Sequence, residues 1–284
     1  MTNALNRTGH LAALAMGFLA CLVVLSARLG AVELQGQFVQ GGHAYGQVSP
    51  GTIVTFGERR VPVAADGRFM VGFDRDHPST VAVTLSPPGG VRETVTLEIA
   101  PREYKIQRID GVPPQFVSPP PDASARINTD REKKNAARRQ ITSESGFAED
   151  FEWPLVGIVT GVYGSQRYYN QEPKPRRPHY GIDIAAPAGT PVVAPAAGKV
   201  TLADPDMYFE GGLIFLDHGG GMISAFLHLG EIAVAVGDRV EKGDRLAAVG
   251  STGRSTGAHL DWRIFWLNQR IDPALLVGPM PETP

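Results

Sequence analysis

The sequence predicts a mainly β protein in which two domains are joined by a Pro-rich linker and one helix. Three observations support this fold class. The chain of 284 residues contains 33 Gly and 23 Pro, which favours tight turns between short strands. Short β-branched or alternating apolar runs recur between these turns in both halves of the chain. Prolines cluster at residues 113–121, where regular structure should stop.

The composition is that of a globular protein without a strong overall electrostatic field. Hydrophobic residues make up 43% of the chain and charged residues 20%. The 27 basic and 29 acidic residues leave a formal net charge of -2, so we expect no nucleic-acid partner. The one cysteine, Cys21, lies in an N-terminal apolar run, so we expect neither a disulfide nor a catalytic thiol in the mature chain.

Residues 1–31 are predicted to be a targeting segment, either a signal peptide or a signal anchor. Arg7 and His10 precede an apolar run from Leu11 to Leu25, and a run of about 15 residues suits a signal peptide better than a membrane span. We therefore expect export to the periplasm or cell envelope. Contact with a membrane is expected only if the segment stays uncleaved, which remains open because small residues are poorly placed for cleavage.

Residues 32–112 are predicted to form a small β-sandwich that serves as an accessory domain. Asp66-Gly67 gives the clearest hairpin turn in this region. His43 and His77 have no partner at ligand spacing, so we expect them at the surface or in turns. The candidate strands are residues 36–39, 52–56, 61–64, 68–73, 80–85 and 93–99.

Residues 113–150 are predicted to be the Pro-rich linker followed by one helix. Residues 123–142 contain no Gly or Pro and are rich in charge, which indicates an exposed helix. Its basic cluster either faces solvent or contacts a polyanion such as a cell-wall polymer or a lipid head group. The cluster consists of Arg131, Lys133, Lys134, Arg138 and Arg139.

Residues 151–284 are predicted to form a compact antiparallel sheet that curls towards an open barrel, with little room for helices. Residues 237–244 are expected to form a tight reversal within it. The candidate strands are residues 157–163, 180–184, 190–194, 198–203, 213–217, 222–227, 245–249 and 259–266.

Five residues in this second half have the chemistry of a metal-dependent hydrolase. His179 and Asp183 are four residues apart in an extended segment, so their side chains share one face of a strand. His259 and Asp261 repeat the even spacing, and His228 lies between the two pairs. A catalytic zinc takes three protein ligands and leaves one position to water, and a nearby His can then move protons.

The second half also carries a series of short motifs in a fixed order. They are His179-Tyr180-Gly181-Ile182-Asp183, Ala186-Pro187-Ala188-Gly189-Thr190-Pro191-Val192, Gly198-Lys199-Val200, Asp217-His218-Gly219, Leu227-His228-Leu229, Gly237-Asp238-Arg239-Val240 with Gly243, Gly250-Ser251-Thr252-Gly253-Arg254-Ser255-Thr256-Gly257, His259-Leu260-Asp261 and Asp272-Pro273. With these motifs, residues 151–277 resemble the lysostaphin-type zinc metallopeptidases. The family has a duplicated hybrid motif fold and cleaves peptide cross-links of bacterial peptidoglycan.

The resemblance implies a Zn²⁺-dependent endopeptidase whose partner is the peptide cross-link of peptidoglycan. It makes His179 and Asp183 metal ligands, and His228 and His259 the catalytic histidines beside the metal. The family's third ligand is the second His of a His-x-His pair, and Asp261 stands at that position here.

Asp261 leaves two interpretations open. A carboxylate is an acceptable zinc ligand, so the site of His179, Asp183 and Asp261 stays possible. Two anionic ligands would weaken the metal as a Lewis acid and raise the pH optimum. The alternative is a degenerate, metal-free family member that acts as a peptidoglycan-binding module or as an activator of another wall hydrolase. We favour the enzyme, because four of the five site positions keep the family's residue and Asp261 can still bind metal.

Residues around the site have less specific expectations. His218 is expected to act structurally, in the turn between two strands. A regulatory protein of the envelope is left open as a partner, and we expect a monomer. The upstream domain would either orient the peptidase domain on the wall or cover its cleft. Residues expected to line the groove are Tyr163, Arg167, Tyr168 and Tyr169.

Overall fold

The structure is a computed structural model that describes residues 25–29 and 32–282 of the chain. Most of the predicted targeting segment, residues 1–31, therefore lies outside the described residues. Its described part is strand β1 (Leu25–Leu29), which pairs antiparallel with β2 (Val32–Gly36). Among the described residues, no helix is both long enough and apolar enough to cross a membrane.

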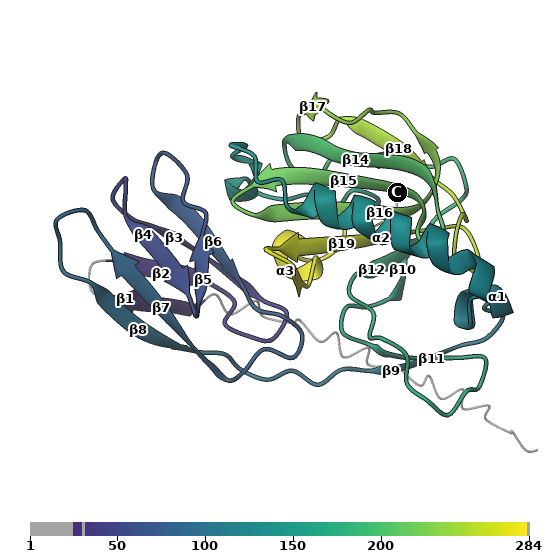
Figure 1. The fold of residues 1–284 in the computed structure, drawn as a ribbon, viewed down its shortest axis with the longest axis horizontal. Coiled ribbons are helices and arrows are strands. Elements are labelled where there is room, and N and C mark those ends of the chain that lie inside the picture. Colours follow the sequence, from purple (N-terminus) through teal and green to yellow (C-terminus); the bar gives the residue numbers. More distant parts are fainter. Residues whose placement is uncertain (1–24, 30–31, 283–284) are drawn as a thin grey trace, which may run out of the picture.

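Two β-rich regions lie side by side and are connected by a long segment that carries the main helix (Figure 1). The first contains two four-stranded sheets, ordered β1-β2-β3-β6 and β5-β4-β7-β8. Leu34, Phe69 and Val71 of one sheet share a core with Val54 and Val83 of the other. The remaining bounds are β3 (His43–Gln47), β4 (Ile53–Phe56), β5 (Arg59–Val61), β6 (Arg68–Gly72), β7 (Thr80–Ser86) and β8 (Glu93–Glu98).

The hairpin predicted at Asp66-Gly67 is wrong. A turn does form there, because Gly67 has a φ of 88° and Ala64 N–H donates to Arg68 O at 2.8 Å. The strands on its two sides belong to different sheets, since β5 pairs with β4 and β6 pairs with β3. Val48 N–H donates to Gly67 O at 2.9 Å, which places the start of β6 beside β3.

Two further expectations for this region need correction. The strand predicted at residues 36–39 is absent apart from Gly36, because the chain turns back at once and Gln37 N–H donates to His43 O at 2.8 Å. His43 and His77 are buried, with 6% and 7% of their surface exposed, so neither is a surface histidine. The prediction of a turn holds for His77, whose N–H donates to Asp74 O at 3.1 Å. His77 packs against the ring of Phe73, and burial lowers the pKa of His43 to about 4.

The connecting segment runs along the second region. Strand β9 (Ile106–Ile109) pairs in parallel with β11 (Gln166–Tyr169), so the chain is tied to the second region before its helix begins. Parallel pairing of such distant segments leaves no local pattern in the sequence. Two short helical turns, α1 (Pro114–Val117) and η1 (Pro121–Ala123), follow.

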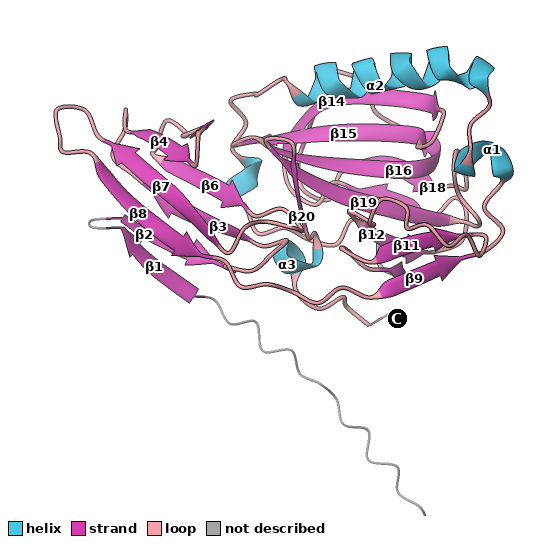
Figure 2. Cartoon of the chain, turned by 60° about the horizontal axis from the view of Figure 1, so that its bottom comes forward, coloured by secondary structure: helices cyan, strands magenta, loops and turns pink. Residues whose placement is uncertain are grey.

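Helix α2 (Ser124–Arg138) lies along strand β14 (Figure 2). Three residues of its basic cluster contact the sheet region. Lys133 Nζ lies 2.7 Å from Asp204 Oδ2, and Lys134 Nζ lies 2.5 Å from Glu210 Oε1. The guanidinium carbon of Arg138 lies 5.0 Å from the ring centroid of Phe265. Lys134 and Arg138 thus fix the helix to the sheet, a role that was not predicted, whereas Arg131, Lys133 and Arg139 are exposed, in line with the predicted solvent-facing cluster.

The second region is a ten-stranded sheet ordered β10-β12-β19-β16-β15-β14-β17, in which β18 also pairs with β13 and β16, and β20 with β19. All of its pairings are antiparallel, which confirms the predicted fold class. The bounds are β10 (Ile158–Gly161), β12 (Ile182–Ala185), β13 (Pro191–Val193), β14 (Gly198–Met207), β15 (Gly211–Gly219), β16 (Met222–Ile232), β17 (Arg239–Val240), β18 (Arg245–Val249), β19 (His259–Trp266) and β20 (Gln269–Ile271); the helical turns are η2 (Gly146–Ala148) and α3 (Ala274–Val277).

The two regions pack directly on each other. The ring of Phe56 meets Trp266 edge to face, with 5.5 Å between centroids. A Cβ on Gly72 would lie 2.9 Å from Ile271 Cγ2, so this glycine permits the close approach. Arg102 Nη2 forms an ion pair with Asp272 Oδ2 at 3.0 Å, next to the apolar contact. The first region therefore supports the sheet at the end where β19 and β20 meet.

Candidate metal centre and active site

Strands β12 and β19 bring the predicted ligands together. Their register places Asp183 directly opposite Asp261, and His179 precedes β12 in the extended segment that leads into it. His179, Asp183 and Asp261 each offer a ligand atom, and these atoms all lie within 4.8 Å of one another. The three residues are 1%, 7% and 1% exposed, so the cluster is closed to bulk solvent on most sides.

The unpartnered atoms of this cluster fit a bound cation. Within the described part of the chain, His179 Nε2 and Asp183 Oδ1 are buried and have no hydrogen-bond partner. They lie 3.2 Å apart. A buried polar atom without a partner is costly, and a metal ion would satisfy both atoms at once. His179 and Asp183 are therefore the two proposed ligands whose atoms are most clearly available to a metal ion.

Asp261 is already engaged by an arginine. Arg263 binds it through both carboxylate oxygens, with Nε 2.9 Å from Oδ1 and Nη2 2.5 Å from Oδ2. Burial alone would raise the pKa of Asp261, but the Arg263 guanidinium lowers it to about 2. Each oxygen keeps a second lone pair, so Asp261 can still act as a ligand while Arg263 fixes its orientation.

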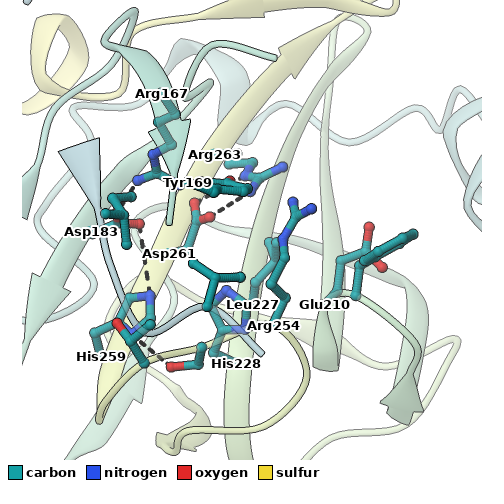
Figure 3. Close-up of a pocket in the computed structure, with 15 residues that line it drawn as sticks. Arg167, Tyr169, Asp183, Glu210, Leu227, His228, Arg254, His259, Asp261 and Arg263 are labelled. Atoms are coloured by element: carbon teal, nitrogen blue, oxygen red, sulfur yellow. Dashed lines mark hydrogen bonds and ion pairs between the residues drawn. The ribbon is translucent and has the colours of Figure 1, made fainter. Parts of the chain in front are cut away.

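Asp183 has an arginine of its own. Arg167 forms an ion pair with Asp183 Oδ2, which leaves Oδ1 facing His179. Burial would raise the pKa of Asp183, whereas His179 and Arg167 hold it well below its usual range. The two carboxylates of the site are thus matched by two guanidinium groups (Figure 3).

Two glycines make room for these ion pairs. A Cβ on Gly181 would lie 2.6 Å from Asp261 Oδ1 and 2.5 Å from Arg263 Cγ. A Cβ on Gly161, the β10 residue opposite Asp183, would lie 2.3 Å from Asp183 Oδ2. Real Cβ atoms do not approach other atoms this closely, so a side chain at Gly161 would displace the Asp183 carboxylate, and one at Gly181 would also meet the backbone oxygen of Trp262.

The predicted catalytic histidines lie beside each other at the same site. The rings of His228 and His259 are 4.8 Å apart between centroids, and His259 Nε2 is 3.8 Å from Asp183 Oδ1. His228 Nδ1 bonds to Thr252 O and His259 Nδ1 to Gly257 O, each at 2.8 Å. A carbonyl oxygen only accepts, so each neutral ring carries its proton on Nδ1 and keeps Nε2 free as a base.

The backbone at His228 is unusual. Its φ is 65°, in the left-handed region that residues other than glycine rarely adopt. Its N–H donates to Glu210 O at 2.9 Å, outside the regular strand ladder. Burial lowers the pKa of His228 to about 4, so the ring is neutral near pH 7. Such strain often occurs at functional sites, because the surrounding structure must impose it.

The cluster opens into a pocket of about 80 Å³. Arg167 and Tyr169 line it as expected, but Tyr163 and Tyr168 do not. Tyr163 is buried and its hydroxyl donates to Arg270 O at 2.6 Å, while Arg108 stacks on the Tyr168 ring. The sequence predicted no role at the site for nine further pocket residues, although four of them, Leu227, Arg254, Ser255 and Thr256, belong to the motifs quoted above. The other five are Ile109, Val112, Phe209, Glu210 and Arg263.

The sequence contained a signal for one of these pocket residues, Arg263. Arg263 follows Asp261 by two positions on a strand, so its side chain must share that face. His218 has a structural role, as expected, but it lies within strand β15 and not in the turn between two strands. It is fully buried, and its two ring nitrogens bond to Ala197 O and Ser224 Oγ, each at 2.8 Å.

A family model described as peptidase family M23 matches residues 177–273. A crystal structure described as a candidate peptidase M23 from Pseudomonas aeruginosa has a TM-score of 0.66 and 28% identity, and it covers 86% of this chain and 96% of that one. The peptidoglycan DD-endopeptidase ShyB of Vibrio cholerae is 33% identical over 136 residues, which are 48% of this chain and 27% of the relative.

The DD-carboxypeptidase/endopeptidase Mpg of Neisseria meningitidis is 39% identical over 106 residues, which are 37% of this chain and 24% of the relative. The chain thus spans about a quarter of the length of these two curated relatives. The likeness to the Pseudomonas aeruginosa structure, in contrast, extends over both β-rich regions.

Proposed function

We propose that this chain, which carries a peptidase family M23 domain over residues 177–273, is a zinc-dependent endopeptidase that hydrolyses peptide cross-links of bacterial peptidoglycan. The observation that carries the proposal is the buried cluster of His179, Asp183 and Asp261 beside the paired rings of His228 and His259. The activities named for the Vibrio cholerae and Neisseria meningitidis relatives support the substrate class.

In this proposal His179, Asp183 Oδ1 and one oxygen of Asp261 hold the zinc. A zinc ion at these ligands supplies a Lewis acid that polarises the scissile carbonyl and acidifies a water molecule. His228 and His259 act as bases through their free Nε2 atoms, accept the proton of the attacking water and return it to the leaving amine. The hydrogen bonds of both Nδ1 atoms fix the tautomers for this exchange.

Arg167 and Arg263 reduce the weakening of the metal as a Lewis acid that two carboxylate ligands would cause. Two anionic ligands alone would cancel the formal charge of a divalent cation. Arg167 and Arg263 each neutralise one carboxylate, so the site as a whole keeps the full charge of the metal. We therefore propose that the arginines offset the loss of the family's second imidazole, and that the pH optimum rises less than Asp261 alone would cause.

The rest of the chain fits an exported enzyme with an accessory region. We propose that residues 1–31 direct export to the cell envelope, where peptidoglycan lies, and that the sheets within residues 32–112 serve as an accessory region that packs on the peptidase region. Ile109 and Val112 of the connecting segment line the pocket, which favours a role of this segment in limiting access to the site. Asn170 holds Val112 in place through bonds of 3.0 and 2.7 Å to its N–H and carbonyl.

One observation favours a second candidate function. Because Arg167 and Arg263 already neutralise Asp183 and Asp261, the site is electrically balanced without a metal. A metal-free peptidoglycan-binding module, or an activator of another wall hydrolase, could therefore keep this constellation. The buried atoms of His179 and Asp183 argue for the metal-dependent enzyme, since a module without metal would leave Nε2 and Oδ1 with only each other, 3.2 Å apart, whereas a metal ion would bind both.

Metal analysis combined with a peptidoglycan digest separates the two functions. The purified chain is expected to contain about one zinc per molecule and to release un-cross-linked muropeptides, while a His179→Ala variant prepared in parallel does neither. Protein that binds no divalent metal and releases nothing, yet sediments with peptidoglycan, would instead establish the binding module.

A further inference from the structure

One cation in the pocket has no acidic partner. Arg254 lies in the loop before β19 and lines the pocket together with Asp183 and Asp261, two of the proposed metal ligands. Its backbone N–H donates to Phe209 O at 2.8 Å, but among the described residues its guanidinium forms no hydrogen bond or ion pair. In Figure 3 its side chain rises between Asp261 and Glu210.

Two aromatic rings hold this guanidinium in place. Its central carbon lies 5.0 Å from the ring centroid of Phe209 and 5.6 Å from that of Tyr169. Cation–π contacts of this kind fix the plane of a guanidinium without using its N–H groups. The donors of Arg254 therefore remain available to a molecule that enters the pocket.

The other charges that line the pocket are paired. Arg167 pairs with Asp183, Arg263 with Asp261, and Glu210 with Lys134 of helix α2. Arg254 is thus the cation of this lining that is left without a counter-charge among the described residues. A guanidinium removed from bulk water gains most from an anion with matching geometry, and a carboxylate offers two oxygens to its planar fork.

We propose that Arg254 binds a free carboxylate of the substrate, on the residue whose amine is released when the scissile bond breaks. The proposal rests on the proposed peptidase function. The pocket has a volume of only about 80 Å³ and is lined by Arg254 together with Asp183 and Asp261, two of the three proposed ligands, so a carboxylate bound there belongs to a residue next to the scissile bond. A residue that joins a cross-link through its amine alone keeps its α-carboxylate free.

The same chemistry would allow release of a C-terminal residue. A substrate of a carboxypeptidase carries its free carboxylate directly after the scissile bond, as does a cross-link formed through an amine. Arg254 is therefore a specificity-determining residue that selects for a carboxylate on the leaving side and does not take part in proton transfer.

A binding experiment without turnover tests this site. The full chain, freed of metal with a chelator so that the dipeptide is not hydrolysed, is titrated with N-acetyl-D-alanyl-D-alanine and with its C-terminal amide, and the Nε–Hε signal of Arg254 is followed by NMR. We expect the acid to shift this signal and to bind about tenfold more tightly than the amide, since a charge-assisted bidentate contact is lost in the amide. The proposal is overturned if the acid leaves the signal unshifted or binds no more tightly than the amide.

Matched variants show which residue causes the preference for the acid over the amide. Arg254→Gln should bind acid and amide equally, and Arg254→Lys should keep part of the preference because it retains the charge without the fork. Arg245→Gln, which removes an exposed arginine paired with Glu231, should leave the preference unchanged. A preference that persists in Arg254→Gln would assign the carboxylate to another residue; if that variant does not fold, the lysine variant and the wild-type comparison decide.

Failure of this site and failure of the proposed function give different results. A chain that prefers the acid but releases no muropeptides keeps the carboxylate site and loses the endopeptidase assignment. A chain that hydrolyses cross-links but binds acid and amide equally keeps the endopeptidase assignment and loses the carboxylate site.

Discussion

Asp183 on β12 is the direct cross-strand partner of Asp261 on β19, and each of the two carboxylates is bound by an arginine of its own. Like charges opposite each other destabilise a sheet, and the cost is greater when both are buried. Arg167 and Arg263 remove that repulsion, so the pair of aspartates and the pair of arginines form one unit.

Removal of Arg263 should therefore cost stability and change the response to metal. Arg263→Gln leaves Asp261 buried without its counter-ion, which should destabilise the metal-free protein by about 3 kcal/mol or more. Zinc should then raise the melting temperature of the variant more than that of the wild type, because the metal replaces the missing charge. Calorimetry with and without zinc measures both effects; equal zinc-induced shifts in the two proteins would contradict this.

The ligands should contribute unequally to metal affinity. His179 is the one imidazole of the proposed set, and its Nε2 has no other partner among the described residues. His179→Ala should lower zinc affinity by more than about 100-fold, whereas Asp261→Asn should cost less because Arg263 already shares that carboxylate. Competition with a chelator gives both affinities, and a larger loss in Asp261→Asn would reverse the order proposed here.

His228 should matter for hydrolysis but not for metal content. Its Nδ1 is bound to Thr252 O, and its role is assigned to proton transfer. His228→Ala should lower the rate of muropeptide release about 10²- to 10⁴-fold while bound zinc stays near the wild-type level. Loss of zinc in this variant would show that His228 is a ligand.

Gly181 should tolerate no side chain. Gly181→Ala brings a Cβ within 2.6 Å of Asp261 Oδ1 and 2.5 Å of Trp262 O, so strands β12 and β19 must separate. We expect a loss of about 1–3 kcal/mol in the free energy of unfolding by urea, together with weaker metal binding. Gly257→Ala is the matched control, because a Cβ there meets nothing within 4 Å. Equal stability of the two variants would argue against the tight packing described.

Stability should fall in mild acid because of two buried histidines away from the site. Burial lowers the pKa of His43 and of His218 to about 4, from 6.5 in the unfolded chain. Between these values the unfolded state binds more protons, so this contribution is complete above pH 6.5 and is lost as the pH falls towards 4.

Urea unfolding at a series of pH values measures this dependence. Each histidine should contribute up to about 1.4 kcal/mol per pH unit within that window. A His43→Leu variant should show a correspondingly smaller slope. The same slope in variant and wild type would mean that His43 is not buried in its neutral form.

The sequence predicted the parts of this protein that depend on local spacing. The even separations of His179 from Asp183 and of His259 from Asp261 indicated an extended backbone, and Asp183, His259 and Asp261 do lie on strands while His179 precedes β12. The structure brings His179, Asp183 and Asp261 into one cluster, with His259 beside it. Arg263 could have been added by the same rule, since it lies two positions after Asp261 on one strand.

Features that depend on distant contacts were not predictable in this way. The hairpin expected at Asp66-Gly67 does not form because Val48, which follows β3, donates its N–H to Gly67 O. The parallel pairing of β9 with β11 joins segments about 60 residues apart and has no local signal. Arg254 reaches the pocket only because Phe209 and Tyr169 come together around it. The burial of His43 likewise follows from sheet pairing that its own neighbours do not indicate.

The contact between Phe56 and Trp266 also determines how this chain can be divided for experiments. A fragment that begins at residue 151 would uncover the face of Trp266 that Phe56 now shields, and it would leave β11 without β9. Exposed apolar surface of this kind promotes aggregation. With a truncated chain, an effect of removing the connecting segment from the pocket could not be told apart from an effect of lower solubility. Single substitutions at Val112 leave the contact between Phe56 and Trp266 intact and are therefore the better way to open the pocket.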